Sequence, residues 1–159
     1  MSSGTGRWRE PLVSVCLVGM RRQFAAGDEL EAEYQIDAVP ADEIQAVEAA
    51  VLWYAEGKGD KDLGVHFFER RTPADAEDGD LRLLRRFKIK LPLSPLSYQG
   101  ALLTIRWCVR VRLFLKRGKE YVAEQAFSIG SVPPGTAGWP RTSPAGLRTA
   151  SRQSQTGQG

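Results

Sequence analysis

The stretch LTIRWCVRVRL at residues 103–113 decides the fold class, because apolar and polar residues alternate along all of it. A helix repeats every 3.6 residues and cannot bring alternate residues to one face, whereas successive side chains of a strand point to opposite faces. The stretch is therefore predicted to be a strand with one face in a core. The apolar side carries Leu103, Ile105, Trp107, Val109, Val111 and Leu113.

The same period of two recurs in both directions along the chain, with Gly, Pro and Asp in the breaks where the chain must reverse. In 63–70 the pattern leaves the facing open, because Phe67 and Phe68 fall on opposite sides. Helix propensity competes with strand only in 41–50, and the β-favouring residues that follow favour the strand. The predicted strands are 13–17, 29–37, 47–54, 63–70, 83–91, 103–113 and 121–129.

Seven short strands separated by turns predict an all-β fold, a two-sheet sandwich of immunoglobulin-like shape. The predicted core centres on Trp53, Phe87 and Trp107, since each aromatic side chain can bury ~150–250 Å².

The two ends of the chain differ from the part between them. Residues 1–9 are predicted to be a flexible N-terminus and 10–130 the sandwich domain. Residues 131–159 are rich in Pro, Gly, Ser, Thr and Gln and are predicted to be a disordered tail, because they offer too little apolar surface to offset the entropy of ordering. Within the tail Trp139 is an apolar anchor; plain linker is the preferred interpretation, and a docking motif or a cover for the sandwich are the alternatives.

The positive charge belongs to the ends. The chain has 22 Lys plus Arg against 19 Asp plus Glu, and the tail holds three Arg and no acid. Removing Arg7 and Arg9 as well leaves the predicted domain with 17 basic and 19 acidic residues. A nucleic-acid-binding domain would carry the excess charge itself, so no nucleic-acid partner is expected.

The chain shows neither a secretory signal nor an apolar run long enough to span a bilayer, and it contains no Asn and hence no N-glycosylation site. Cys16 and Cys108 are too few for a disulfide framework. We expect a reduced, cytoplasmic setting, although the sequence leaves a disulfide between the two cysteines open.

A family resemblance rests on FKIKLPLSPLSYQG at 87–100 and TIRWCV at 104–109. These segments resemble the arrestin-fold N-terminal domain, in which a strand ending in Leu-Pro leads through a Ser/Pro-rich loop into an Ile-Arg-aromatic strand. FAAGDEL at 24–30 and the region from 48 to 60 are similar to the family more weakly, and the match covers roughly 12–130.

The resemblance implies an immunoglobulin-like sandwich and an adaptor or scaffold role. Two features depart from the family pattern. We expect no second arrestin domain, because only the tail follows Gly130, and no basic strand precedes Leu12. Phosphate sensing is therefore not expected here.

Residues for catalysis and metal binding are scarce, and no cofactor or metal is expected. His66 is the single histidine, and no ligand cluster, phosphate-binding loop or nucleophile elbow is present. The loop at 57–62 has Asp60 and Asp62 but lacks the other ligands of a calcium site. The preferred interpretation is a hydrophilic hairpin loop, and because a rigid sandwich would hold it, Lys58, Asp60 and Asp62 form a candidate binding loop. A hydrolase built on His66 with Asp60 or Asp62 is the least favoured hypothesis.

Basic residues form two stripes, opposed in sequence by an acidic stripe at Glu29, Glu31, Glu33 and Asp37. The preferred interpretation is that acidic and basic strands pair across a sheet. The alternative is an open basic face that binds a partner protein or peptide, anionic lipid or another polyanion. The candidate binding face is Arg86, Lys88, Lys90, Arg106, Arg110 and Arg112. A non-catalytic protein-interaction module is the leading functional hypothesis.

Overall fold

The computed structural model describes residues 10–57, 59 and 61–130. The chain divides into two units, Met1–Ile129 and Gly130–Gly159, and only the first is considered below. The predictions for 1–9, for the tail with Trp139, and for Lys58 and Asp60 lie outside the described residues.

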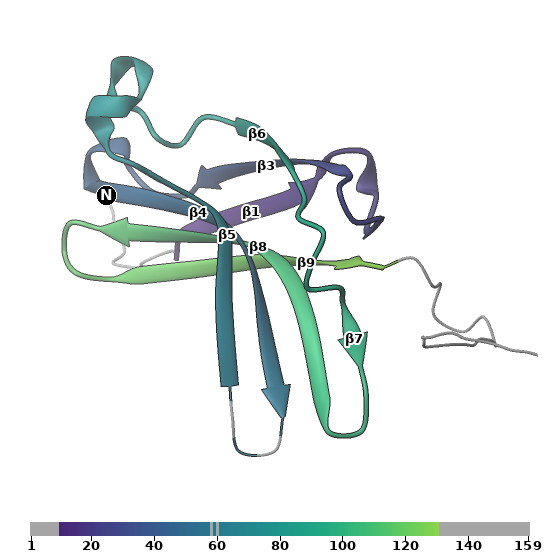
Figure 1. Cartoon of the computed structure of the whole chain (residues 1–159). Coiled ribbons are helices and arrows are strands. Elements are labelled where there is room, and N and C mark those ends of the chain that lie inside the picture. Colours follow the sequence, from purple (N-terminus) through teal and green to yellow (C-terminus); the bar gives the residue numbers. More distant parts are fainter. Residues whose placement is uncertain (1–9, 58, 60, 131–159) are drawn as a thin grey trace, which may run out of the picture. The chain divides into compact units, whose positions relative to one another are not determined.

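The described part of the chain is an all-β sandwich of two sheets, as predicted, and contains no α-helix (Figure 1). The small sheet has the order β1–β3–β6, and the large sheet has the order β2–β9–β8–β4–β5, with β7 paired to β8. The small sheet consists of β1 (Leu12–Leu17), β3 (Glu29–Asp37) and β6 (Arg85–Lys90). The large sheet consists of β2 (Gln23–Phe24), β4 (Ile44–Gly57), β5 (Lys61–Arg71), β7 (Tyr98–Gln99), β8 (Leu103–Leu115) and β9 (Glu120–Ile129).

All seven predicted segments are strands. β2 and β7 were not predicted, because two residues are too few to show an alternation. The strand predicted from residue 83 begins only at Arg85, and Leu83 is exposed in the preceding loop. Neighbouring strands are antiparallel, except for the short parallel pair of β2 with β9.

The core lies between the sheets, and Trp107 is fully buried in it. The Trp107 indole Nε1–H donates to the carbonyl of Pro95 at 2.8 Å, so the buried polar atom is satisfied. Phe87 is also buried and stacks on Phe67 with ring centroids 4.9 Å apart. Trp53 is half-buried at the margin and lies across Gly64, where an added Cβ would come within 2.3 Å of Trp53 Nε1.

A β-bulge in β5 explains why the sequence left its facing open. The register with β4 shifts between Val51 and Leu52, so His66 lies between the residues paired to them. Phe67 then points into the core while Phe68 is exposed on the other face. The adjacent apolar residues Phe67 and Phe68 therefore lie on opposite faces of β5.

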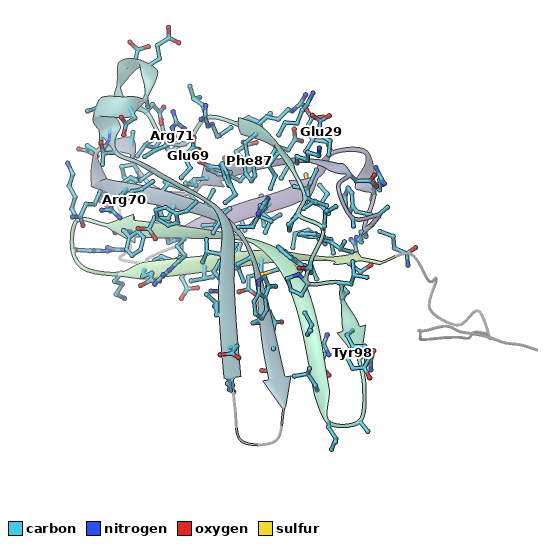
Figure 2. The ribbon with its side chains drawn as sticks, viewed as in Figure 1. Glu29, Glu69, Arg70, Arg71, Phe87 and Tyr98 are labelled. Atoms are coloured by element: carbon cyan, nitrogen blue, oxygen red, sulfur yellow. The ribbon has the colours of Figure 1, made fainter. Side chains whose placement is uncertain are left out.

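Side chains of β5 and β6 close one edge of the sandwich. Arg85 forms an ion pair with Glu69 at 2.5 Å, and His66 Nε2–H donates to the Lys90 carbonyl at 2.7 Å. Glu69 and Phe87 mark this edge in Figure 2. These contacts join the two sheets without a backbone ladder.

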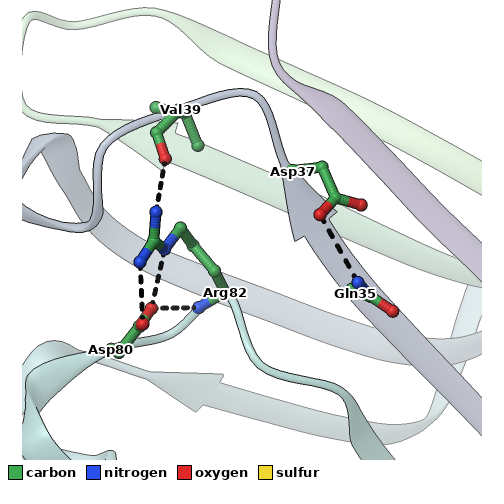
Figure 3. Close-up of polar contacts among 5 residues, drawn as sticks. All are labelled: Gln35, Asp37, Val39, Asp80 and Arg82. Carbon is green, nitrogen blue, oxygen red and sulfur yellow. Dashed lines mark hydrogen bonds and ion pairs between the residues drawn. The ribbon is translucent and has the colours of Figure 1, made fainter.

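Arg82 joins the loop before β6 to the loop that follows β3. Its guanidinium donates to both carboxylate oxygens of Asp80 at 3.0 Å and to the Val39 carbonyl at 3.4 Å (Figure 3). These Arg82 bonds hold the pKa of Asp80 below its usual range. The loop also contains the 3-10 turns η3 (Pro73–Asp75) and η4 (Glu77–Gly79).

Candidate docking surface

The large sheet extends beyond the small sheet. The lower ends of β4, β5, β7 and β8 project past the second layer as a four-stranded ribbon, with neither face covered by the small sheet in the described part (Figure 1). We call this segment the ribbon. It comprises Tyr54–Gly57 of β4, Lys61–Val65 of β5, β7, and Leu103–Arg106 of β8.

Exposed apolar side chains gather where β7 turns into β8. Leu102 is 73% exposed, Tyr98 57% and Leu103 41%, and Leu96 lies exposed just before β7. Figure 2 shows Tyr98 on the ribbon, away from the two packed layers. We call Tyr98, Leu102 and Leu103 the ribbon tip. A cluster of apolar side chains at a projecting turn is typical of an interaction site.

Two glycines allow the backbone to pack tightly at this turn. Gly100 N–H donates to the Leu103 carbonyl at 2.9 Å and closes the turn, and the Tyr98 ring lies where a Cβ on Gly100 would stand. A Cβ on Gly57 would lie 2.7 Å from the Leu102 carbonyl oxygen. The tip is thus held against the end of β4.

The outer face of the large sheet, turned away from the small sheet, has an apolar cluster of its own. Ala50, Leu52 and Cys108 are buried there, and Tyr54 packs against them, separately from the main core. Beside them on β5, Leu63, Val65 and Phe68 are 53–54% exposed. The large sheet is therefore apolar on both faces.

Ion pairs border this outer apolar cluster. Arg110 pairs with Glu124 and Arg112 with Glu120, each at 2.5 Å, and Arg70 pairs with Glu48 at 2.7 Å. Arg106 lies opposite Tyr54 in register, and among the described residues its side chain has no hydrogen bond or ion pair. It is exposed beside the apolar cluster.

The outer face of the small sheet is polar. Arg86 contacts Glu33 at 2.8 Å and Glu31 at 3.6 Å, and Lys88 lies 4.0 Å from Glu29. The hydrogen bond with Glu33 raises the pKa of Arg86. Lys90 is exposed opposite Glu29.

The structure does not bring the six basic candidates onto one face. Arg86, Lys88 and Lys90 lie on β6 in the small sheet, whereas Arg106, Arg110 and Arg112 lie on β8 in the large sheet. The two basic strands therefore do not lie side by side. The strand that each basic strand pairs with depends on the order of strands in the two sheets. The alternation pattern of the sequence does not reveal that order.

Of the predicted binding loop, the structure describes Asp62 alone, which is exposed at the start of β5. No group of three or more potential metal ligands occurs among the described residues. His66 donates from Nε2 to the Lys90 carbonyl, which leaves Nδ1 as the acceptor nitrogen of the neutral ring.

The two cysteines lie on different sheets, and both are free thiols. Cys16 is exposed on the small sheet, and its pKa is raised by partial burial and by the nearby Glu33 carboxylate. Burial raises the pKa of the Cys108 thiol to about 11. The disulfide that the sequence left open is thus absent between these two described residues.

Neither apolar surface was predicted from the sequence. For the outer face a signal existed, since β4 carries Val51 and Trp53 on one parity and Leu52 and Tyr54 on the other. For the ribbon tip, Tyr98 and Leu102 lie in a segment interpreted only as a turn. Nothing in the local pattern indicated that the turn projects from the sandwich.

The fold is similar to that of a solved structure, the sporulation control protein Spo0M from Bacillus subtilis, with a TM-score of 0.55 and 13% sequence identity. The similarity covers 77% of this chain and 50% of Spo0M, so the chain spans about half the length of that protein. No family model and no curated protein sequence matches the chain. The similarity concerns the fold alone, and it agrees with the arrestin-like β-sandwich that the sequence predicted. No helix among the described residues is long and apolar enough to cross a membrane.

Proposed function

We propose that this chain is a non-catalytic, adaptor-like interaction module that binds another protein or peptide through the ribbon tip. The observation that carries the proposal is the gathering of exposed apolar side chains at Tyr98, Leu102 and Leu103. Burying such side chains against a partner gains ~25 cal/mol per Å² of apolar surface. We place the module in the cytoplasm, where thiols stay reduced.

The charges of the two sheets favour a protein partner over a polyanion. Binding to phosphate groups needs cations that are free to replace counterions. Four of the six basic candidates already lie in ion pairs with glutamates: Arg86, Lys88, Arg110 and Arg112. The hydrolase alternative gains no support, because among the described residues His66 has a hydrogen bond to the Lys90 carbonyl and none to Asp62.

The test is affinity capture from native lysate with the tagged full chain, its Leu102→Lys variant and its Leu83→Lys variant. Leu102 and Leu83 are both strongly exposed, at 73% and 62%, but only Leu102 lies at the ribbon tip. We expect proteins recovered by the wild type and by Leu83→Lys to fall about tenfold or more with Leu102→Lys. The proposal fails if nothing is recovered above background, or if the two variants behave alike.

A further inference from the structure

We infer that the free edge of β5 in the ribbon, at Lys61–Val65, is a strand-addition site, where an extended segment of a partner protein pairs as a further strand. The inference goes beyond the proposed function, because β5 and the ribbon tip lie at opposite edges of the ribbon, whose strand order is β5–β4–β8–β7. It rests on the unpaired backbone of this edge and on the side chains that flank it.

The backbone of β5 has a partner on one side only. Its ladder is formed with β4, and among the described residues no hydrogen bond reaches the backbone of Lys61–Val65 from the other side. Above the bulge, Phe67 and Glu69 contact β6, whereas the lower part of β5 lies at the margin of the ribbon, away from β6 (Figure 1). A row of unpaired N–H and C=O groups is satisfied by an extended chain, whose own groups have the same spacing.

The other strand edges are less suited to a further strand. β2 and β7 have two residues each. β1 lies close to β9 of the large sheet, which narrows access to its free edge. β6 carries Arg86, Lys88 and Lys90, and charges of one sign along an edge oppose pairing with another chain. The two charges at the start of β5, on Lys61 and Asp62, are of opposite sign, and Leu63–Val65 has none.

Gly64 opens the β5 edge to an aromatic surface. Because Gly64 has no side chain, the Trp53 indole extends over it, with Nε1 and Cζ2 at 2.3 and 2.7 Å from the position of an added Cβ. The indole is half-buried, and its Nε1–H has no acceptor within the part of the chain that the structure describes. Cross-strand neighbours on one face have Cβ atoms ~4.5–5.5 Å apart, so a partner side chain opposite Gly64 contacts the Trp53 ring.

The residues around Gly64 specify the sequence of the partner strand. Asp62 shares the face of Gly64, is exposed, and forms no ion pair with another described residue. Leu63 and Val65 point to the other face and are 54% and 53% exposed. An antiparallel partner strand therefore has an aromatic residue opposite Gly64, a basic residue opposite Asp62 and apolar residues at the two other positions. From its N-terminus, the pattern is apolar–aromatic–apolar–basic.

The first experiment selects displayed random peptides of about twelve residues on the tagged full chain, and we expect this pattern to be enriched. Asp62→Lys should weaken binding of a selected peptide about fivefold or more, because an attraction becomes a repulsion. Asp42→Lys, exposed in the turn before β4, should leave binding unchanged. Replacing the basic residue of the peptide with Glu should restore its binding to the Asp62→Lys chain.

The second experiment tests backbone pairing with a synthetic form of a selected peptide. N-methylation of every second amide should abolish binding and N-methylation of the amides between them should be tolerated, since alternate N–H groups of a strand point to the same neighbour. Binding should also shift the fluorescence of Trp53 to shorter wavelength as the indole loses water, and Trp53→Phe should remove the shift. Circular dichroism of each variant checks folding.

The inference is overturned if no peptide is enriched, if N-methylation shows no alternation, or if Asp62→Lys and Asp42→Lys bind a selected peptide equally well. Peptides that Leu102→Lys loses and Asp62→Lys keeps also overturn it, because they bind the ribbon tip. Leu102→Lys should leave peptides of the β5 edge bound. Loss of capture from lysate with intact peptide binding therefore bears on the ribbon tip alone.

Discussion

The outer faces of the two sheets are built from strands of the same period but differ in chemistry. On the small sheet, Glu31 and Glu33 flank Arg86, and Lys88 lies near Glu29. On the large sheet the middle of the face is apolar, and ion pairs stand only around it. Charged pairs on the small sheet keep their contact with water, whereas Leu52 and Cys108 are almost fully withdrawn from it.

The difference separates a solvent face from an interaction face. A sheet in a two-layer sandwich needs only one apolar face to build the core, and the other is normally polar. The small sheet follows this rule and the large sheet does not. The fold does not require the apolar surface on the outer face of the large sheet. Binding of a partner to that face would explain why it is apolar.

The largest difference in unfolding free energy between the two outer faces should appear when a carboxylate is placed on each of them. Leu52→Asp puts a charge into the buried outer cluster and should lower the free energy of unfolding by about 3 kcal/mol or more. Ser14→Asp, on the exposed outer side of β1, should change it by less than about 0.5 kcal/mol. Urea denaturation at about 1 µM chain measures both, below the range of weak association. Similar losses for the two variants would remove the distinction between the faces.

The fold was largely predictable, because alternation is local. Residues 103–113 alone identify a strand, and five further segments with the same period, together with the apolar segment 63–70, predict a sandwich. The burial of Trp107 follows from its place on the apolar side of that strand. Nothing beyond neighbouring residues is needed for these inferences.

The candidate site was much less predictable, because it depends on strand order. β3 pairs with β6 about 50 residues further on, and so the acidic stripe meets Arg86 and not Arg106. The bulge at His66 inverts the facing of β5 within a single strand, which no fixed period can show. The projection of the ribbon depends on where the small sheet ends, and that is a property of the packed molecule.

A second prediction compares adjacent residues of β5 on opposite faces. Gly64→Ala places a methyl group 2.3 Å from Trp53 Nε1 and should cost about 1–3 kcal/mol through displacement of the indole. Val65→Lys, on the outer face, should change the unfolding free energy by less than about 0.5 kcal/mol. Thermal unfolding of the two variants at equal concentration gives the comparison. An unperturbed Gly64→Ala would mean that Trp53 does not lie across this strand.

The two cysteines extend the comparison to pH, since one lies on each outer face. Burial raises the pKa of Cys108 to about 11, above the ~8.5 of an unfolded thiol. Between these pH values the unfolded chain releases the proton and the folded chain keeps it. The stability linked to this thiol is therefore complete below about pH 8.5 and is lost as pH rises toward 11, by about 1–2 kcal/mol after allowance for screening.

Urea denaturation from pH 7 to 10.5 measures this loss in a Cys16→Ser background, so that Cys108 is the thiol that titrates. Adding Cys108→Ala removes the titrating group, so the free energy of unfolding of this variant should not show the loss, and the two pH profiles should diverge as pH rises. Parallel profiles with and without Cys108 would show that the thiol is solvated in the folded chain.

The smallest effect concerns the ion pairs themselves. Arg110 and Glu124 lie opposite each other on β8 and β9 at the edge of the apolar cluster, and their side chains are 26% and 38% exposed. A double-mutant cycle with Arg110→Ala and Glu124→Ala should give a coupling of about 0.2–1 kcal/mol. On the small sheet the Arg86 side chain is 54% exposed, so its coupling with Glu33 should be weaker and more sensitive to added salt. A larger coupling energy for Arg86 with Glu33 than for Arg110 with Glu124 would contradict this prediction. The ion pairs would then not distinguish the two outer faces, and only the apolar cluster of the large sheet would.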